Sequence, residues 1–342
     1  MPLNNRILHG HALDVLRTLP AGSVQCCVTS PPYWGLRDYG VKGQIGLEKD
    51  LEQYVDCLAE VFAEIWRVLK KDGTLWINMG DAYSSNFGKR KRGDAAGAKQ
   101  NSNPASITMP GRYVPGLRPK NLLGIPWRVA FALQDTGWIL RQEIIWHKPN
   151  PMPESVKDRC TNSHEHIFLL AKSERYYFDQ EAILEPCSPN THARFSQDVI
   201  RQAGSIRANG GTRMNRPMKP VGRRFDPCRG NKNNESFDLA MVVMPEKRNK
   251  RSVWTVTTRG FKGAHFATFP PDLIRPCILA GSRPGDLVLD PFFGAGTTGL
   301  VADELGRLWL DIELKAEYCA LAMNRIERST KDERQQRRIA QA

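Results

Sequence analysis

Long apolar runs and paired cysteines are missing from this sequence. The chain has no uninterrupted stretch of about 18 apolar residues, the length that crosses a bilayer, and Met1–Gly10 holds no apolar leader core. Its eight cysteines form no C-x-x-C pair, which argues against a zinc site and against a disulfide scaffold. We therefore expect a cytoplasmic protein without a membrane segment, a resident metal or disulfides.

The composition is that of a globular protein. Hydrophobic residues make up 41% of the 342 residues, which is enough for a sizeable core and excludes wholesale disorder. At roughly 150 residues per domain, this length fits two domains or one large α/β domain with an insertion.

The basic charge is concentrated in two segments. The whole chain carries +13, of which Asn86–Lys120 contributes +7 and Glu185–Arg259 contributes +9, so the remainder carries −3. A solvated face explains either segment alone, but two such segments favour a polyanionic partner.

The first part of the chain alternates between strand and helix patterns. We expect strands at Arg6–His9, Val24–Thr29 and Thr74–Asn78, with helices at 11–19 and Leu51–Leu69 between them. Lys70–Gly73 is expected to end the second helix. This alternation predicts a parallel sheet covered by helices on both faces.

The pattern continues between two irregular basic segments, a mobile loop at 84–120 and a region at 186–250. The other predicted helices are Pro126–Gln134, Pro270–Leu279, a helix from the glycines at 294–296 through Leu305, and Ala316–Ile326. The other predicted strands are Trp138–Trp146, His166–Ala171, Leu287–Asp290 and Trp309–Ile312.

The strongest local signal is a glycine loop between a strand and a helix, Asp290-Pro291-Phe292-Phe293-Gly294-Ala295-Gly296-Thr297. Glycines at this point let a nucleotide-type cofactor approach the backbone. The next strand ends in Asp311-Ile312-Glu313, at the offset where an acid binds ribose hydroxyls. The loop lacks the third glycine of a dinucleotide site and the Gly-Lys-Ser/Thr of a P-loop. A glycine turn that serves packing alone is the competing interpretation.

A second signal, Ser30-Pro31-Pro32-Tyr33, ends the apolar strand Val24–Thr29. Two prolines remove backbone donors and leave rigid carbonyl groups facing outward. A hydroxyl beside a carbonyl can accept hydrogen bonds from an aromatic amine, and Tyr33 offers a stacking face. These four residues favour a nucleobase site, although a simple strand-terminating turn has the same composition.

With these motifs the chain resembles the amino-group DNA methyltransferases, which methylate N4 of cytosine or N6 of adenine. Ser30–Tyr33 is similar to their catalytic motif, the loop at 290–297 to their methionine-binding loop, and His265–Pro270 to the segment that precedes that loop. The catalytic motif comes first, as in the permuted β class. The resemblance implies a circularly permuted, Rossmann-like α/β fold with an inserted target-recognition region at 186–250. It also implies catalytic parts at 1–185, cofactor-binding parts at 251–330 and a tail at 331–342.

The resemblance further implies S-adenosylmethionine as cofactor and double-stranded DNA as partner. Ser30, Pro31, Pro32 and Tyr33 are the expected catalytic residues. The expected cofactor-binding residues are His11, Phe266, Thr268, Asp290, Pro291, Phe292, Gly294, Gly296, Thr297 and Glu313. His11 departs from the family pattern, which commonly has an acid that contacts the cofactor adenine, and Asp14 is either its substitute or a surface residue.

The implied chemistry is direct methyl transfer to a base flipped out of the duplex. Ser30 at the first motif position favours N4 of cytosine, with N6 of adenine as the alternative. An inactive DNA-binding homologue, or an enzyme acting on RNA or a protein amide, is a more remote alternative. The sequence leaves open the recognition site, the oligomeric state and whether a separate restriction endonuclease accompanies the enzyme.

Weaker candidates remain. Each of Cys187, Cys228 and Cys277 follows a proline, as the nucleophile of cytosine-C5 enzymes does, but none is followed by Gln and all precede the glycine loop. We interpret them as ordinary cysteines. The remaining candidates are Asp81 and His147–Asn150 near the target pocket or in turns, His164 and His166 as packing or surface residues, and Trp254 and Trp309 as core.

Overall fold

The computed structural model of the chain describes residues 4–85, 112–187, 246–258 and 269–340, with side chains up to residue 329. Contacts between Cα atoms divide the chain into two compact units, Met1–Ala182 with Arg251–Ala342, and Ile183–Lys250. The larger unit carries the sheet and the helices described below. The described part of the smaller unit contains an antiparallel pair of short strands, β6 (Glu185–Pro186) and β7 (Lys247–Arg248).

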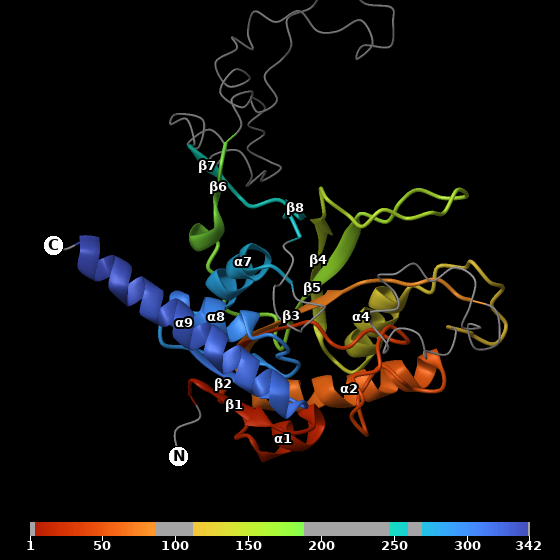
Figure 1. Cartoon of the computed structure of the whole chain (residues 1–342), viewed down its shortest axis with the longest axis horizontal. Helices are drawn as coiled ribbons and strands as arrows, with labels where there is room; N and C mark the ends of the chain where they lie inside the picture. Colours follow the sequence, from red (N-terminus) through yellow and green to blue (C-terminus); the bar gives the residue numbers. More distant parts are fainter. Residues whose placement is uncertain (1–3, 86–111, 188–245, 259–268, 341–342) are drawn as a thin grey trace, which may run out of the picture. The chain divides into compact units, whose positions relative to one another are not determined.

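An eight-stranded sheet runs through the described part of the larger unit, in the order β1-β10-β9-β2-β3-β5-β4-β8 (Figure 1). The strands are β1 (Arg6–His9), β2 (Val24–Thr29), β3 (Leu69–Met79), β4 (Ile139–His147), β5 (His164–Ala171), β8 (Val253–Thr255), β9 (Leu287–Asp290) and β10 (Leu308–Glu313). From β1 to β3 all neighbours are parallel, whereas β5 is antiparallel to both β3 and β4. Because β10 pairs with β1, the two ends of the sequence meet in one sheet, which confirms the predicted permuted Rossmann-like fold.

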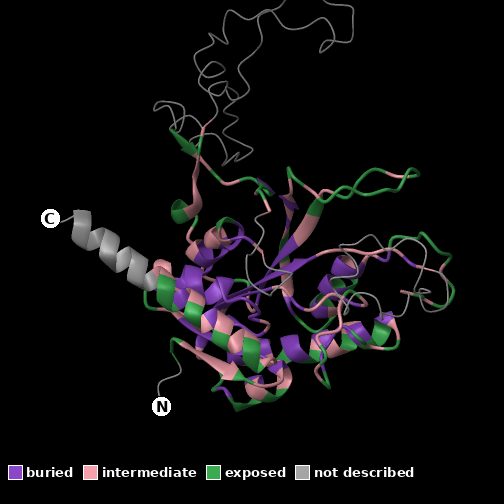
Figure 2. Ribbon diagram, viewed as in Figure 1, coloured by how far each residue is buried: buried purple, intermediate pink, exposed green. Residues whose placement is uncertain are grey.

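Helices cover both faces of this sheet. On one face, α1 (Ala12–Thr18), α2 (Leu51–Val68) and α4 (Ile125–Asp135) share a hydrophobic core with the strands. None of the buried residues of α7 (Pro271–Gly281), α8 (Thr297–Glu304) or α9 (Ala316–Ala340) belongs to that core, and α8 contacts both α7 and α9. A short 3-10 turn, η2 (Glu181–Ile183), completes the described elements. The buried residues in Figure 2 follow the sheet and the inner faces of these helices.

The sequence explains why these segments take their forms. In α2, Tyr54, Leu58, Val61, Phe62 and Ile65 recur at helical spacing and are all fully buried. Asp50 begins this helix, since its carboxylate accepts a hydrogen bond from the Gln53 amide at 2.9 Å. All six residues of β2 are buried, as expected for a parallel strand covered on both faces.

Two elements differ from the predicted ones by more than two residues at one end. The expected turn at Lys70–Gly73 is part of β3, which pairs with β2 at Val24↔Leu69 before the register shifts to Cys26↔Thr74. Four residues, Lys70–Gly73, lie opposite the single residue Gln25 and form an irregularity in the ladder, where Asp72 accepts hydrogen bonds from the Gln25 side chain. Helix α9 also continues to Ala340, through most of the segment predicted as a tail.

Several predictions fall largely outside the described residues. Of the basic segments, 86–111 and 188–245 are not described, nor are Phe266 and Thr268. The seven cysteines with described positions are free. No helix of the described ranges is long and apolar enough to cross a membrane. Trp254 and Trp309 are buried, as predicted for core residues.

Candidate active site

A cavity of about 790 Å³ opens where the parallel strands of the larger unit end. Its walls include Gly10–Ala12 after β1, Ser30–Trp34 after β2, Asn78 and Gly80–Ala82 at the end of β3, Pro291–Ala295 after β9, and Ile312–Lys315 at the end of β10. Ligands of open parallel sheets bind at this edge, outside the carboxyl ends of the strands. The volume is in the range of small-molecule sites.

The two strongest sequence motifs lie next to each other in this cavity. Strands β2 and β9 are parallel neighbours with Cys27 opposite Leu289, so the segments that follow them leave the sheet side by side. The Thr29 hydroxyl donates a hydrogen bond to Asp290 Oδ1 at 2.6 Å, between the last residues of the two strands. The predicted catalytic motif and the predicted cofactor loop are therefore joined through a buried contact.

Asp290 fixes the glycine loop through hydrogen bonds to its carboxylate. Its carboxylate also accepts hydrogen bonds from Thr298 Oγ1 at 2.7 Å and from the Phe292 amide at 3.0 Å. Burial raises the pKa of Asp290 from 3.8 to about 6, although the hydrogen bonds from Thr29, Thr298 and Phe292 act to lower it. Asp290 does not line the cavity. Its carboxylate is directed into the protein, where it fixes the path of the backbone.

A second buried carboxyl group supports the same loop. Asp311 Oδ1 accepts a hydrogen bond from the Asp290 amide at 3.0 Å. Burial, and then the charge of Asp290, raise the pKa of Asp311 well above its usual value. A Cβ atom on Gly299 would lie only 2.6 Å from Asp311 Oδ2, so helix α8 can approach this carboxyl group only with glycine at that position.

Glu313 holds the glycine loop from the end of β10. Its Oε2 accepts a hydrogen bond from the Gly294 amide at 2.9 Å, and its Oε1 accepts one from the Lys315 amide at 2.8 Å. Burial raises its pKa. Gly296 takes φ +81°, and a Cβ there would lie 2.8 Å from Ala322 Cβ on α9. The positive φ and this close approach both require glycine.

The other predicted cofactor residues with described positions lie at the cavity wall. Pro291, Phe292 and Thr297 line it, and Phe292 also packs against the core. His11 lines it too, at the start of α1, whereas Asp14 is exposed and lies 3.9 Å from Arg17. Asp14 is therefore a surface residue and does not substitute for an acid at position 11.

This half of the cavity fits a nucleoside-type cofactor. The backbone of Gly294 is left open to a ligand by the absence of a side chain. Each Glu313 oxygen uses one lone pair on a backbone amide and keeps another for a hydroxyl group. The half-buried ring of Phe292 adds an aromatic surface.

The Ser30–Tyr33 motif is held rigidly at the other half of the cavity. The Pro32 carbonyl accepts a hydrogen bond from the Tyr54 hydroxyl at 2.8 Å, and Trp34 Nε1 donates to the Glu48 carbonyl at 3.1 Å. Ser30 is half-buried and Pro31 is buried, and both line the cavity. The motif therefore presents its hydroxyl and carbonyl groups from a fixed backbone.

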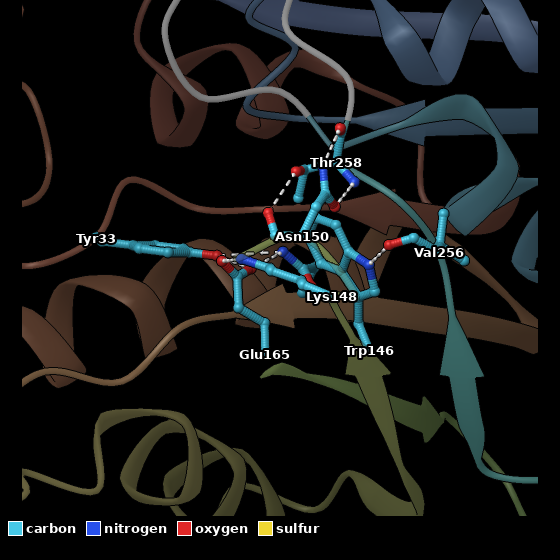
Figure 3. A network of polar contacts seen from close by, with 8 residues as sticks. Tyr33, Trp146, Lys148, Asn150, Glu165, Val256 and Thr258 are labelled. Atoms are coloured by element: carbon cyan, nitrogen blue, oxygen red, sulfur yellow. Dashed lines mark hydrogen bonds and ion pairs between the residues drawn. The ribbon is translucent and has the colours of Figure 1, made fainter. Parts of the chain in front are cut away.

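Tyr33 joins a polar network that sequence reasoning missed (Figure 3). Its hydroxyl donates to Glu165 Oε2 at 2.8 Å and accepts from Asn78 Nδ2 at 3.1 Å. Burial, and then the Glu165 charge, raise the pKa of Tyr33 well above its usual value, while a hydrogen bond from Ser30 acts in the opposite direction. The phenol therefore stays protonated and remains a donor.

Comparison with known proteins identifies the family. The family model of N6/N4-type DNA methylases matches residues 24–324. The chain belongs to this family of DNA methylases. The type II methyltransferase M.Cfr9I of Citrobacter freundii is 47% identical over 321 residues, which are 94% of this chain and 87% of the relative.

Two solved structures share the fold. The PvuII DNA methyltransferase, described as cytosine-N4-specific, is 19% identical with a TM-score of 0.58, covering 94% of this chain and 85% of its own. TTHA0409 of Thermus thermophilus, crystallised with S-adenosyl-L-methionine, is 23% identical with a TM-score of 0.54, covering 95% of this chain and 93% of its own.

Within this DNA methylase, the weaker sequence candidates are divided between structural roles and the cavity. Asp81 lines the cavity, but its carboxylate accepts hydrogen bonds from the Gly124 and Ile125 amides, both at 3.0 Å, at the start of α4. His166 Nδ1 lies 2.6 Å from Glu143 Oε1, and His164 lines the cavity. Among the described residues, no group of three or more His, Cys, Asp or Glu side chains is arranged to hold a metal.

Two of the network residues, Asn78 and Glu165, were not predicted. Asn78 is the second-to-last residue of the strand β3 beside the predicted site, and Glu165 lies between two histidines at the start of β5. The sequence signal for both was a polar side chain near the end of an apolar strand, at the carboxyl end for Asn78 and at the amino end for Glu165. Only the antiparallel β3–β5 pairing, with Asn78 opposite Ile167, brings Glu165 to the carboxyl end of β3.

Proposed function

We propose that this DNA methylase transfers a methyl group from S-adenosylmethionine to the exocyclic N4 of cytosine in double-stranded DNA. The observation that carries the proposal is the pairing of β2 with β9. It brings Ser30–Tyr33, our proposed target site, beside Pro291–Gly294, our proposed cofactor loop, and both segments line one cavity. A direct displacement requires this proximity of donor and acceptor.

The cofactor supplies a methyl group activated by a sulfonium centre. Gly294 and Glu313 are the residues we propose to bind it, through the open backbone of the loop and a ribose hydroxyl at the Glu313 carboxylate. The ring of Phe292 would face the sulfonium and attract it through a cation–π interaction. Asp290 and Gly296 act indirectly, because they fix the loop without lining the cavity.

The target amino group needs help to react. Its lone pair is delocalised into the base ring, which makes the nitrogen a poor nucleophile. Ser30 Oγ and the Pro31 carbonyl would accept its two hydrogen bonds, localise the lone pair and aim it at the methyl group. Positioning of this kind supplies several kcal/mol of barrier reduction. Tyr33 would stack on the base after the base leaves the duplex.

Ser30 also supports cytosine over adenine as the target. Among the enzymes that this chain resembles, the motif of cytosine enzymes begins with Ser, whereas the motif of adenine enzymes more often begins with Asp or Asn. The cytosine-N4-specific neighbour has the same fold. At position 30 the hydroxyl acts as an acceptor toward a base amine.

Duplex DNA is the partner we propose for the two basic segments, with 186–250 as the target-recognition region. If about 6–8 of their cations meet phosphates, the logarithm of affinity falls against the logarithm of salt concentration with a slope of about −5 to −7. Fluorescence anisotropy with a labelled duplex over a range of salt concentrations measures this slope. A nearly flat dependence would contradict the assignment. A type II relative at 47% identity supports site-specific modification alongside a separate endonuclease.

Nucleoside mass spectrometry tests the target base directly. DNA is incubated with the protein and methyl-labelled S-adenosylmethionine, digested, and separated into nucleosides. We expect labelled N4-methylcytosine. Labelled N6-methyladenine would mean that adenine, and not cytosine, is the target base. Label in neither base would contradict methyl transfer to DNA. A parallel RNA sample is expected to remain unlabelled.

A further inference from the structure

We propose that Glu165 is a positioning residue for methyl transfer, which acts by holding the Tyr33 ring in the orientation that receives the target base. The inference rests on the proposed function, because it assigns a role within the same target pocket. Glu165 is the second residue of β5, and it lines the cavity at a point remote in sequence from both motifs.

Three donors from three segments converge on the Glu165 carboxylate. The Tyr33 hydroxyl and Asn78 Nδ2 both donate to Oε2 at 2.8 Å. The Lys148 ammonium donates to Oε1 and forms an ion pair with it. The Lys148 and Glu165 side chains are 19% and 17% exposed, so water screens the pair only partly.

The contacts of Tyr33 leave its ring little freedom. At one end the hydroxyl is fixed by Glu165 and Asn78, and at the other the Tyr33 carbonyl accepts a hydrogen bond from the Leu36 amide at 3.2 Å. The ring edge lies against Gly80, where an added Cβ would be 2.8 Å from Tyr33 Cε2. A ring held at its hydroxyl and along its edge keeps one face toward a ligand in the cavity.

Lys148 is itself held in place. Its ammonium lies 4.4 Å from the centroid of the Trp146 ring, whose Nε1 donates to the Val256 carbonyl at 2.9 Å. Figure 3 shows this cation between Glu165 and the indole ring. Asn150, two residues on, pairs with Thr258 through reciprocal hydrogen bonds of 3.0 Å. The Glu165 carboxylate, which holds Tyr33, is therefore neutralised by Lys148, whose own position is fixed by its neighbours.

Only a carboxylate satisfies all three donors. Glutamine at position 165 would offer one oxygen and one NH₂ group, so either the Lys148 ammonium or the Tyr33–Asn78 pair would face another donor. Glu165→Gln therefore changes the network with almost no change in volume. A loose Tyr33 would lower the rate of transfer without touching the cofactor loop.

The test is a double-mutant cycle on single-turnover methyl transfer. We expect Glu165→Gln to lower the rate about 10-fold, since small errors of orientation are costly in a displacement reaction. Tyr33→Phe, which keeps the ring and loses its hydroxyl anchor, should lower it to a similar degree. The double variant should be no slower than Tyr33→Phe alone. The dissociation constant for S-adenosylmethionine should stay within about twofold in all three.

The matched control is Glu143→Gln. Glu143 also pairs with a basic side chain across β4 and β5, at His166, but it does not line the cavity, and its variant should transfer methyl at the parental rate. A parental rate in Glu165→Gln would overturn the proposal. The proposal would also be overturned if Glu165→Gln lowered the rate by the same factor in the Tyr33→Phe background as in the parent. Glu165 would then act independently of Tyr33.

A second variant guards against a folding defect. Lys148→Met removes the cation and keeps the apolar stem, and its rate loss should again disappear in the Tyr33→Phe background. A loss that persists there would contradict a role through Tyr33. A parental protein that methylates no DNA would refute the proposed function, whereas an active parent with additive variants would refute the Glu165 inference alone.

Discussion

The two halves of the cavity are built by different means. In the cofactor half, buried carboxylates of Asp290, Asp311 and Glu313 bind backbone amides within and next to the glycine loop. In the target half, the side chains of Tyr33 and Glu165 bind each other and those of Asn78 and Lys148. One half is a fixed backbone shape, and the other is a set of interlocked side chains.

This difference separates binding from turnover. A cofactor held by backbone amides and a ribose contact depends on loop geometry, so changes there should act on affinity and stability. A base held by the Ser30 and Tyr33 side chains beside the Pro31 carbonyl depends on the orientation of those side chains, so changes there should act on the rate. Substitutions in each half of the cavity test this division.

The largest effect is expected from Ser30→Ala. It removes a proposed acceptor for the amino group, and we expect turnover to fall by about 10² to 10³-fold, the range found when one polar contact to a reacting group is lost. The dissociation constant for S-adenosylmethionine should change less than about threefold. Single-turnover kinetics and isothermal titration calorimetry measure the two quantities. Equal losses in both would mean that Ser30 belongs to the cofactor half.

The next effect concerns the pH dependence of stability. Folding raises the pKa of Asp290 from 3.8 to about 6, so the folded state binds this proton more tightly than the unfolded state. The resulting stabilisation is complete below about pH 4 and is lost as the pH rises through 6. At ~1.4 kcal/mol per pKa unit, the free energy of unfolding relative to Asp290→Asn should fall by about 3 kcal/mol across this window. Urea unfolding at about pH 4 to 7 measures it.

Asp286→Asn is the matched control for that experiment. Burial acts to raise the pKa of Asp286, but hydrogen bonds from Lys70 Nζ and the Arg283 amide, with the Lys70 charge, lower it overall. Its contribution is present above about pH 4 and is lost only at lower pH. The stability difference between parent and Asp286→Asn should therefore stay level between about pH 4 and 7. The same downward trend in both variants would contradict a specific effect of Asp290.

The smallest effect is expected from Glu313→Gln. One of the two amides, Gly294 or Lys315, would lose its acceptor, and we expect affinity for S-adenosylmethionine to fall about 10-fold. The rate at saturating cofactor should change little. Glu317→Gln is the control, since its largely exposed carboxylate pairs with Lys315 at 3.3 Å. A rate loss at saturating cofactor would break the division between the two halves.

The sequence predicted the cofactor half better than the target half, for a physical reason. Strand, acid, glycines and helix from Val288 to Thr297 are consecutive, so local patterns suffice to place them. Ser30–Tyr33 was found in the same way. Glu165 reaches Tyr33 only because β5 runs antiparallel beside β3, a pairing that no local pattern in the sequence expressed.

Some element boundaries were wrong for a related reason. The Lys-Lys-Asp-Gly sequence after α2 is typical of a turn. Leu69 nevertheless pairs with Val24 of β2, and the regular pairing of β3 with β2 continues at Thr74. Tertiary pairing overrides local propensity there. For Asp81 the sequence indicated the right neighbourhood, but its hydrogen bonds to the start of α4 depend on a helix that begins 44 residues further along the chain.

A crystal structure with a target duplex and an unreactive cofactor analogue tests the central claim most directly. We expect the flipped cytosine with its amino nitrogen within about 3.2 Å of both Ser30 Oγ and the Pro31 carbonyl. We also expect the base stacked on Tyr33 and the analogue along Gly294 and Glu313. An amino group directed away from Ser30, or an analogue bound outside the glycine loop, would contradict it.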